Sequence, residues 1–213
     1  MTSTDPVRGR GRPARHSLDE LVAIVATQFI ERGYDATSME DLARATGLTK
    51  AALYHHVPGK EEFLRLAVSR GVDALSAALV EAEDLDAPAV QRLELVVRRS
   101  VAVLVANLPY VTLLLRVRGN TATEQWALER RRDLDARTAA LTAEAVADGD
   151  LDPDVDPRLV TRLVFGAVNS VTEWYRPGGS TGADEIGDAL ARMLVDGLRP
   201  GGRALPSTAR RLA

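Results

Sequence analysis

A short segment near the start of the chain, residues 50–56, carries side chains suited to hydrogen-bond with the edges of nucleic-acid bases. With about 100° between successive residues of a helix, these residues divide between two faces. One arc of about 140° holds Lys50, Ala51, Tyr54 and His55, and the other side holds Ala52, Leu53 and His56. The first face offers a cation, a small residue that allows close approach, a phenolic hydroxyl and an imidazole. Such a face suits a major groove, where base edges lie between two rows of phosphates.

The residues before this segment predict a helix that helps to position it. Thr37 and Glu40 have the spacing of a capping box, so a helix is expected to start at Ser38. The buried stripe of this helix is expected to hold Met39, Leu42 and Ala43.

A turn then separates the two helices. Gly47 can adopt the left-handed conformation that ends the first helix, and the hydroxyl of Thr49 can cap the second. Two short helices around a glycine turn are typical of a helix-turn-helix. The alternative is a small helical hairpin in any all-α protein, with a solvated polar face.

Composition favours a helical globular protein without catalytic or metal chemistry. The chain has 213 residues, of which 46% are apolar and 4% aromatic. It contains no cysteine, and its histidines His16, His55 and His56 all lie within the first 56 residues. The remainder therefore lacks the usual residues of a zinc site or a catalytic triad, and we expect no enzyme, no cofactor and no metal. No signal peptide is visible, and the lack of cysteine is compatible with the cytoplasm.

An acidic loop resembles a calcium site in composition but not in spacing. Its members are Asp148, Asp150, Asp152, Asp154 and Asp156. Counted from Asp150, the sixth position is Val155 rather than glycine and the twelfth is Thr161 rather than glutamate. This spacing excludes an EF-hand loop and favours a solvated turn.

The rest of the chain predicts further helices and no strands. Helices are expected over about residues 18–32, 60–83, 86–108, 109–117, 121–147, 156–175 and 184–198. Together with the two short helices they give about nine helices and an all-α fold. Residues 100–117 are apolar but are interrupted by Asn107, Pro109, Thr112 and Arg116, so two buried core helices are expected rather than a membrane span. The charged run at residues 124–133 is expected to be a solvated face.

The N-terminal helices also follow a known sequence pattern. The segment FIERGYDATSMEDLARATGLTKAALYHHVPGKEEFL matches it at Gly33, Tyr34, Thr37, Ala43, Gly47, Leu53, Tyr54 and Lys60. In this respect residues 18–66 resemble the TetR family of bacterial transcription regulators, and from Leu66 onward the likeness lies in helix layout alone. Two residues depart from the pattern, namely Val57, where an aromatic is usual, and Gly59, where Ser, Asn or Asp commonly caps the next helix.

The resemblance implies four regions and a role for individual residues. It implies a disordered basic arm over residues 1–16, a helix-turn-helix DNA-binding domain over 17–59, a ligand-binding and dimerisation domain over 60–199 and a disordered tail over 200–213. Bases would be approached by Lys50, Ala51 and His55, and phosphates would be held by Thr37, Thr49, Tyr54 and Lys60.

The basic arm has two interpretations. Arg10 and Arg12 flank a glycine, as in an AT-hook core whose arginines enter a narrow minor groove. The alternative is a basic tail that adds only counterion release from the phosphates.

The resemblance further implies a homodimeric repressor that a small molecule releases from a palindromic DNA operator. The last two helices are expected to pair across a two-fold axis as a four-helix bundle. Polar or aromatic residues within apolar helices are the candidates for the ligand pocket, namely Asn107, Tyr110, Arg116, Arg118, Trp126, Asn169, Glu173 and Trp174.

The segment EWYRPGG, which runs from Glu173 to Gly179, resembles a motif of TetR regulators that sense acyl-CoA thioesters. Arginines such as Arg116 and Arg118 would suit an entrance that holds phosphates. A lipophilic drug or antibiotic is the alternative effector, and a helical adaptor that does not bind DNA is the alternative function. A membrane is not expected as a partner.

Overall fold

Nine helices and no strands make up residues 16–201, the part of the chain that this computed structural model describes. They are α1 (Leu18–Arg32), α2 (Met39–Thr46), α3 (Lys50–His56), α4 (Lys60–Glu83), α5 (Ala89–Ala106), α6 (Leu108–Arg116), α7 (Ala122–Ala147), α8 (Pro157–Trp174) and α9 (Ala183–Leu198). The expected all-α fold is confirmed. Arg10 and Arg12 of the basic arm, and the tail after residue 201, lie outside the described residues.

Local capping explains where the first helices begin. The side chain of Ser17 accepts a hydrogen bond from the backbone N–H of Glu20, and the Glu20 carboxylate accepts one from the N–H of Ser17, so α1 starts with the expected capping box. Gly47 ends α2 with φ of 68°, a left-handed conformation that glycine adopts without strain. Thr49 caps α3 through a hydrogen bond of 3.1 Å from the N–H of Ala52.

The predicted cap of α2 is wrong by one residue. Ser38, not Thr37, is the N-cap, and it forms a capping box with Asp41 instead of Glu40. The hydroxyl of Thr37 donates instead to the carbonyl of Gly33 at 2.7 Å. This bond closes the turn after α1 and leaves Thr37 1% exposed, so its side chain cannot turn back to cap α2.

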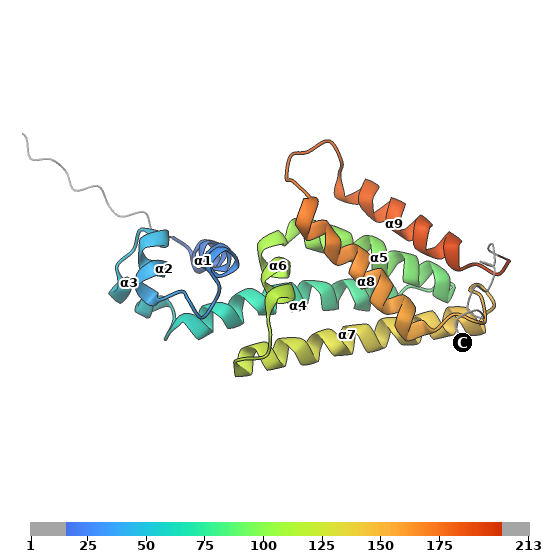
Figure 1. The fold of residues 1–213 in the computed structure, drawn as a ribbon, viewed down its shortest axis with the longest axis horizontal. Coiled ribbons are helices and arrows are strands. Elements are labelled where there is room, and N and C mark those ends of the chain that lie inside the picture. Colours follow the sequence, from blue (N-terminus) through green and yellow to red (C-terminus); the bar gives the residue numbers. More distant parts are fainter. Residues whose placement is uncertain (1–15, 202–213) are drawn as a thin grey trace, which may run out of the picture.

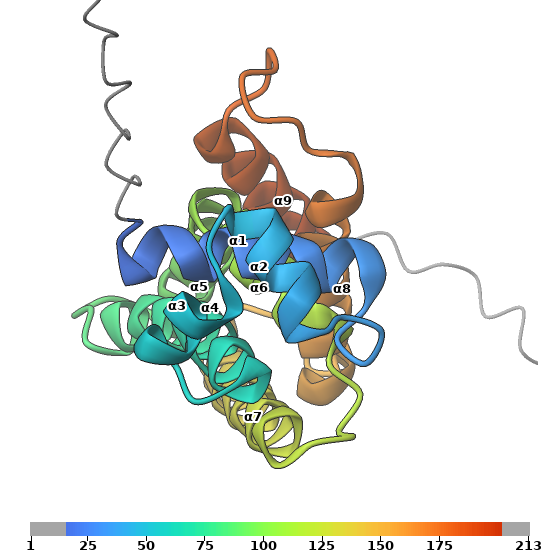
Figure 2. The same cartoon turned by 90° about the vertical axis from the view of Figure 1, so that its left-hand side faces the viewer.

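The helices form a small head and a larger bundle joined by α4. Figure 1 shows α1, α2 and α3 grouped at one end, with α4 running from this head into the bundle, where α7 and α9 lie along opposite edges. Figure 2 looks onto the head end, where α1 and α2 lie in front of α6. A shared hydrophobic core ties the two parts together, because Leu113 and Leu114 of α6 pack in one cluster with Phe29 of α1 and Phe63 of α4.

The apolar stretch at residues 100–117 folds as two core helices, as predicted. The axes of α5 and α6 differ by 103°, and their apolar residues are mainly buried. Over residues 16–201, no single helix is both long enough and apolar enough to cross a membrane, although α5 and α6 together satisfy the length and composition of a span.

The charged run of α7 is not a purely solvated face. Glu124 is only 6% exposed, and its carboxylate accepts hydrogen bonds from the N–H groups of Gly119 at 3.1 Å and Asn120 at 2.6 Å. The turn before α7 leaves these N–H groups without helical partners, so a carboxylate in the first turn of the helix satisfies them. The solvated-face prediction is therefore wrong at Glu124.

Candidate functional site

The exposed face of α3 is the first candidate site. Lys50, Ala51, Tyr54 and His55 are all exposed, and Tyr54 retains 48% of its surface. The opposite face is anchored by Leu53, which is fully buried. The predicted DNA-facing residues of α3 are therefore all accessible, and α3 lies at the head end of the molecule (Figure 2).

His56 departs from the predicted division of the two faces. The helical period puts it on the same side as the buried Leu53, but it is exposed. The helix ends at this residue, and the extended Val57 that follows turns inward and is 3% exposed. Val57 therefore provides the packing contact at the end of α3, in the position where the family pattern has an aromatic.

Lys50 is already engaged within the head. Its ammonium donates to the carboxylate of Glu40 on α2 at 2.6 Å, and both side chains are largely exposed. This hydrogen bond lowers the pKa of Glu40 and raises the pKa of Lys50. Any contact between Lys50 and DNA thus exchanges a carboxylate acceptor for a base-edge or phosphate acceptor.

Two of the predicted phosphate contacts serve the packing of the head. Thr37 is buried and bonded to Gly33, as described above. The ammonium of Lys60, at the start of α4, donates to the backbone carbonyls of Tyr34 at 2.9 Å, Thr37 at 3.0 Å and, more weakly, Asp35 at 3.4 Å. It also lies 4.4 Å from the centre of the Tyr34 ring. The structure thus places Lys60 as a clamp that ties α4 to the turn between α1 and α2.

Thr49 and Tyr54 keep exposed positions beside the α3 face. The Thr49 oxygen accepts the N–H of Ala52, which leaves its hydroxyl hydrogen free to be donated to an outside acceptor. These two residues therefore remain suited to phosphate contacts.

A cavity inside the bundle is the second candidate site. It has a volume of about 260 Å³ and lies among α4, α5, α6, α7 and α8. Its apolar walls come from Leu75, Leu79, Val96, Leu104, Val111, Leu114, Leu115, Leu134, Phe165 and Val168. The polar lining comes from Ser100, Arg131, Asp135, Thr138, Arg162 and Asn169.

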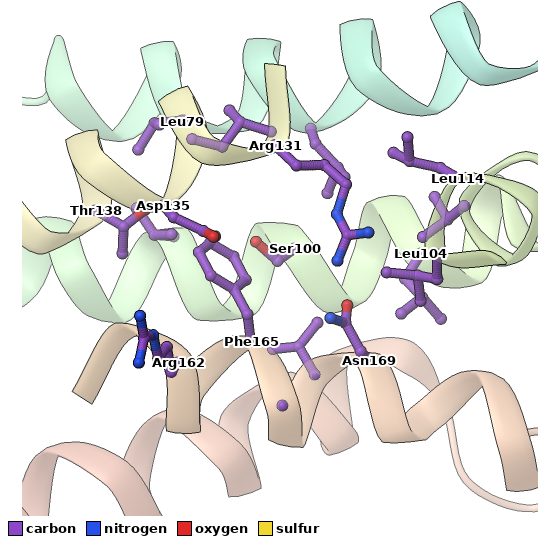
Figure 3. Close-up of a pocket in the computed structure, with 17 residues that line it drawn as sticks. Leu79, Ser100, Leu104, Leu114, Arg131, Asp135, Thr138, Arg162, Phe165 and Asn169 are labelled. Carbon is purple, nitrogen blue, oxygen red and sulfur yellow. The ribbon is translucent and has the colours of Figure 1, made fainter. Parts of the chain in front are cut away.

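The polar side chains are distributed along the cavity. Figure 3 shows the side chain of Arg131 reaching from α7 toward Asn169 on α8, with Arg162 and Asp135 at the other end. Burial raises the pKa of Asp135, and the nearby charges of Arg131 and Arg162 act in the opposite direction. Among residues 16–201, the fully buried hydroxyl of Thr138 has no hydrogen-bond partner. A buried hydroxyl normally has a partner, so this one leaves unused hydrogen-bonding capacity in the cavity lining.

Of the eight predicted pocket residues, only Asn169 lines this cavity. The Asn107 amide donates to the carbonyl of Val103 at 3.0 Å, and the Tyr110 hydroxyl accepts from Arg70 at 2.7 Å. Arg116 and Arg118 line a different hollow, beside α1 and the turn after α6. The remaining three, Trp126, Glu173 and Trp174, are exposed. Residues that the sequence analysis missed, chiefly Arg131, Asp135 and Arg162, supply the charged groups of the cavity.

Among the described residues, no group of three or more His, Asp or Glu side chains is arranged to hold a metal ion.

Comparison with known proteins identifies both parts of the chain. Residues 26–67 match the family model described as bacterial regulatory proteins of the tetR family. Residues 86–198 match a model described as a tetracyclin repressor-like C-terminal domain.

Individual relatives share this arrangement over most of the chain. The crystal structure of SCO3833, a TetR family member from Streptomyces coelicolor A3, is 54% identical, covers 90% of this chain and 97% of its own, and has a TM-score of 0.77. The transcriptional repressor KstR2 of Rhodococcus jostii strain RHA1 is 30% identical over 84% of this chain and 89% of its own. The structure of AibR in complex with isovaleryl coenzyme A and operator DNA is 26% identical, with 83% and 97% coverage and a TM-score of 0.72.

The helix-turn-helix head and the helical C-terminal domain are thus both matched, in sequence and in fold. The chain belongs to the TetR family of bacterial transcriptional regulators, and it is a DNA-binding regulator rather than an enzyme.

Proposed function

We propose that the protein is a homodimeric repressor that a small-molecule effector, an acyl-CoA thioester, releases from a palindromic operator in the cytoplasm. The observation that carries this proposal is the pairing of an exposed α3 face with an internal cavity that contains a buried, unpartnered hydroxyl. The first feature provides a surface for DNA and the second a place for a ligand. The AibR complex contains isovaleryl coenzyme A and operator DNA, which supports the acyl-CoA and DNA-binding parts of the proposal for this chain.

The proposed dimer rests on exposed apolar side chains of the last two helices. Leu159 and Leu163 of α8 are 53% and 59% exposed, and Met193 of α9 is 63% exposed. Pairing α8 and α9 with the same helices of a second copy covers these side chains in a four-helix bundle. A two-fold axis through this bundle presents two α3 helices to successive major grooves, which requires an operator with two-fold symmetry.

Coupling between cavity and head is proposed to run through α6 and α4. Leu114 and Leu115 of α6 line the cavity, and Arg116 at the end of the same helix donates to the carbonyl of Ile30 on α1 at 2.6 Å. Leu75 and Leu79 bring α4 to the same cavity, and Lys60 at the other end of α4 clamps the head. A ligand that shifts α6 and α4 therefore changes the placement of α3, and it releases DNA only if it binds the released arrangement more tightly.

A lipophilic drug or antibiotic is a second candidate effector, because most of the cavity wall is leucine, valine and phenylalanine. Calorimetry that compares acyl-CoA thioesters with uncharged lipophilic drugs separates the two. The charged residues Arg131 and Arg162 favour a ligand with an anionic or strongly polar part.

The most direct test of the DNA-binding part is a mobility-shift assay with the promoter region beside the protein's own gene. We expect a sequence-selective shift that weakens as salt rises, because phosphate contacts release counterions. Failure to shift any neighbouring promoter DNA would favour the helical adaptor.

A further inference from the structure

The size of the cavity limits how much of an acyl-CoA it can hold. A volume of about 260 Å³ has room for about nine heavy atoms, if each takes the roughly 30 Å³ of a water molecule in the liquid. This is enough for a short acyl group and its thioester. The nucleotide and its phosphates must therefore lie outside the cavity, along whatever surface adjoins its mouth.

A groove between α7 and α8 adjoins the cavity. The two concavities share Asp135 and Arg162, so the groove begins where the cavity opens. Its floor is a row of alanines on α7, namely Ala136, Ala139, Ala140 and Ala143. These small side chains leave a hollow of about 590 Å³, which exceeds the volume of the cavity itself.

The charges of this groove suit phosphates. Arg132, Arg158 and Arg162 line it, and among the described residues none of these guanidinium groups pairs with a carboxylate, unlike Arg137 on the same helix, which pairs with Glu83. Two acids also line the groove. They are Asp156, whose carboxylate caps α8 by accepting the N–H of Arg158 at 2.9 Å, and Asp135. Three guanidinium groups thus face two carboxylates, so the lining of the groove carries a net positive charge.

A second hollow competes for the same role but is less suited to it. It meets the cavity at Leu115 and is lined by Arg32, Arg116 and Arg118. Arg32 lies 3.6 Å from the carboxylate of Asp41, and Arg116 donates to the carbonyl of Ile30. Only Arg118 remains without such an engagement among the described residues, so this hollow offers one available cation where the groove offers three.

We propose that the groove between α7 and α8 is the binding site for the phosphates of an acyl-CoA effector, held by Arg132, Arg158 and Arg162, while the acyl group enters the cavity past Asp135. The proposal rests on the proposed function and adds to it the orientation of the ligand. Bidentate hydrogen bonds from guanidinium groups to phosphate oxygens provide the recognition. The shared residues make Arg162 the junction between the acyl and nucleotide parts of the ligand.

Calorimetry on the full-length protein tests this assignment with matched probes. The probes are the CoA thioesters of isovaleric and octanoic acid, and the corresponding S-acyl-pantetheines, which lack phosphates. In the variant Arg132→Ala/Arg158→Ala, we expect the affinity for the CoA thioesters to fall at least about tenfold, because charge-assisted hydrogen bonds are lost. The affinity for the S-acyl-pantetheines should stay within about twofold of the wild type.

Two single variants serve as controls. Arg130→Ala removes the same charge from α7 at an exposed position outside the groove, and it should leave the affinity for both kinds of probe unchanged. Arg118→Ala tests the competing hollow. An equal loss for both kinds of probe, or a loss in Arg118→Ala instead of the double variant, would overturn the assignment.

The outcome separates this inference from the proposed function. Operator binding without ligand is measured on every variant, and unchanged binding shows that the protein is folded and active. If the wild type binds its operator but neither CoA thioester, the acyl-CoA proposal and the groove assignment both fall while the repressor remains. If the wild type and the double variant bind the thioesters with equal affinity, only the groove assignment falls.

Discussion

Replacement of Lys60 by methionine separates two roles for this residue, a phosphate contact and a clamp within the head. In the structure its ammonium donates to three backbone carbonyls, with the bonds to Tyr34 and Thr37 near 3 Å, and it lies over the Tyr34 ring. A hydrogen bond to a charged group contributes about 1.5 to 3 kcal/mol, and a partly exposed cation–π contact about 0.5 to 1 kcal/mol. Water can replace the weaker hydrogen bond to the carbonyl of the exposed Asp35. We therefore expect a loss of about 2 to 3 kcal/mol in the free energy of unfolding.

Two measurements on Lys60→Met distinguish the roles. Thermal unfolding should show a fall in Tm of about 4 to 12 °C, given the usual 2 to 4 °C per kcal/mol for a protein of this size. Operator affinity measured over a range of salt should fall by the same factor at every concentration. If Lys60 instead contacts a phosphate, Lys60→Met should leave the free energy of unfolding unchanged. The slope of log K for operator binding against log salt should then be shallower by about 0.9. That result would refute the clamp, and Lys60→Arg, which keeps the charge, serves as the control.

Four further changes test other parts of the account. Lys50→Ala should weaken operator binding by about 1 to 3 kcal/mol with altered preference at one base pair, whereas a uniform loss across sequences would make Lys50 a phosphate contact. Glu40→Gln should tighten operator binding by up to about fivefold in anisotropy titrations, because it releases Lys50 from its exposed ion pair; unchanged or weaker binding would contradict this. The pKa of Asp41 is lowered from 3.8 to about 2, mainly by hydrogen bonds from Ser38, so its stabilising contribution is complete above about pH 4 and is lost as the pH falls toward 2. Asp41→Asn should lose this part of the acid dependence in unfolding experiments, and an unaltered pH profile would argue against it. Thr138→Val should raise the free energy of unfolding by about 1 kcal/mol, because it removes a buried hydroxyl without a partner, and a loss of stability would imply that an ordered water satisfies the hydroxyl.

Most helix boundaries were predictable because short-range chemistry determines them. The hydroxyl and carboxylate of Ser17 and Glu20, the glycine at position 47 and the hydroxyl of Thr49 act within one turn of the chain. The cap of α2 was ambiguous for the same reason. Thr37 and Ser38 are adjacent hydroxyl residues, and each has an acid three residues later. The bond from Thr37 to Gly33 decided between them, and it depends on the turn after α1, which local spacing does not specify.

The α3 face was predictable because a helix of known register fixes which side chains share a side. The cavity was not, because its lining comes from five helices whose relative rotation depends on tertiary packing. A usable signal was nevertheless present on α7. Arg131 lies three residues before Leu134 and seven before Thr138, both buried, so it shares their inward face despite its place in a charged run. Its long side chain allows the charged end to reach a polar site within an apolar cavity.

The roles first inferred for Lys60 and for the pocket arginines show what sequence patterns leave open. A lysine at the start of a helix beside a DNA-reading head can donate either to a DNA phosphate or to backbone carbonyls of the head. Only the position of the Tyr34–Thr37 turn decides between these roles. Likewise, Arg116 ends an apolar helix and Arg118 follows it, but the bend between α5 and α6 directs both toward α1 instead of the cavity.

The central claim is that ligand in the cavity and operator on the α3 face oppose each other. The most direct measurement is the operator affinity of the wild-type protein, by fluorescence anisotropy at fixed salt, with and without saturating isovaleryl-CoA. We expect a fall of about tenfold or more, and an equal fall in isovaleryl-CoA affinity when operator is bound, since such coupling is reciprocal. Equal operator affinities with and without a ligand that calorimetry shows to be bound would contradict it.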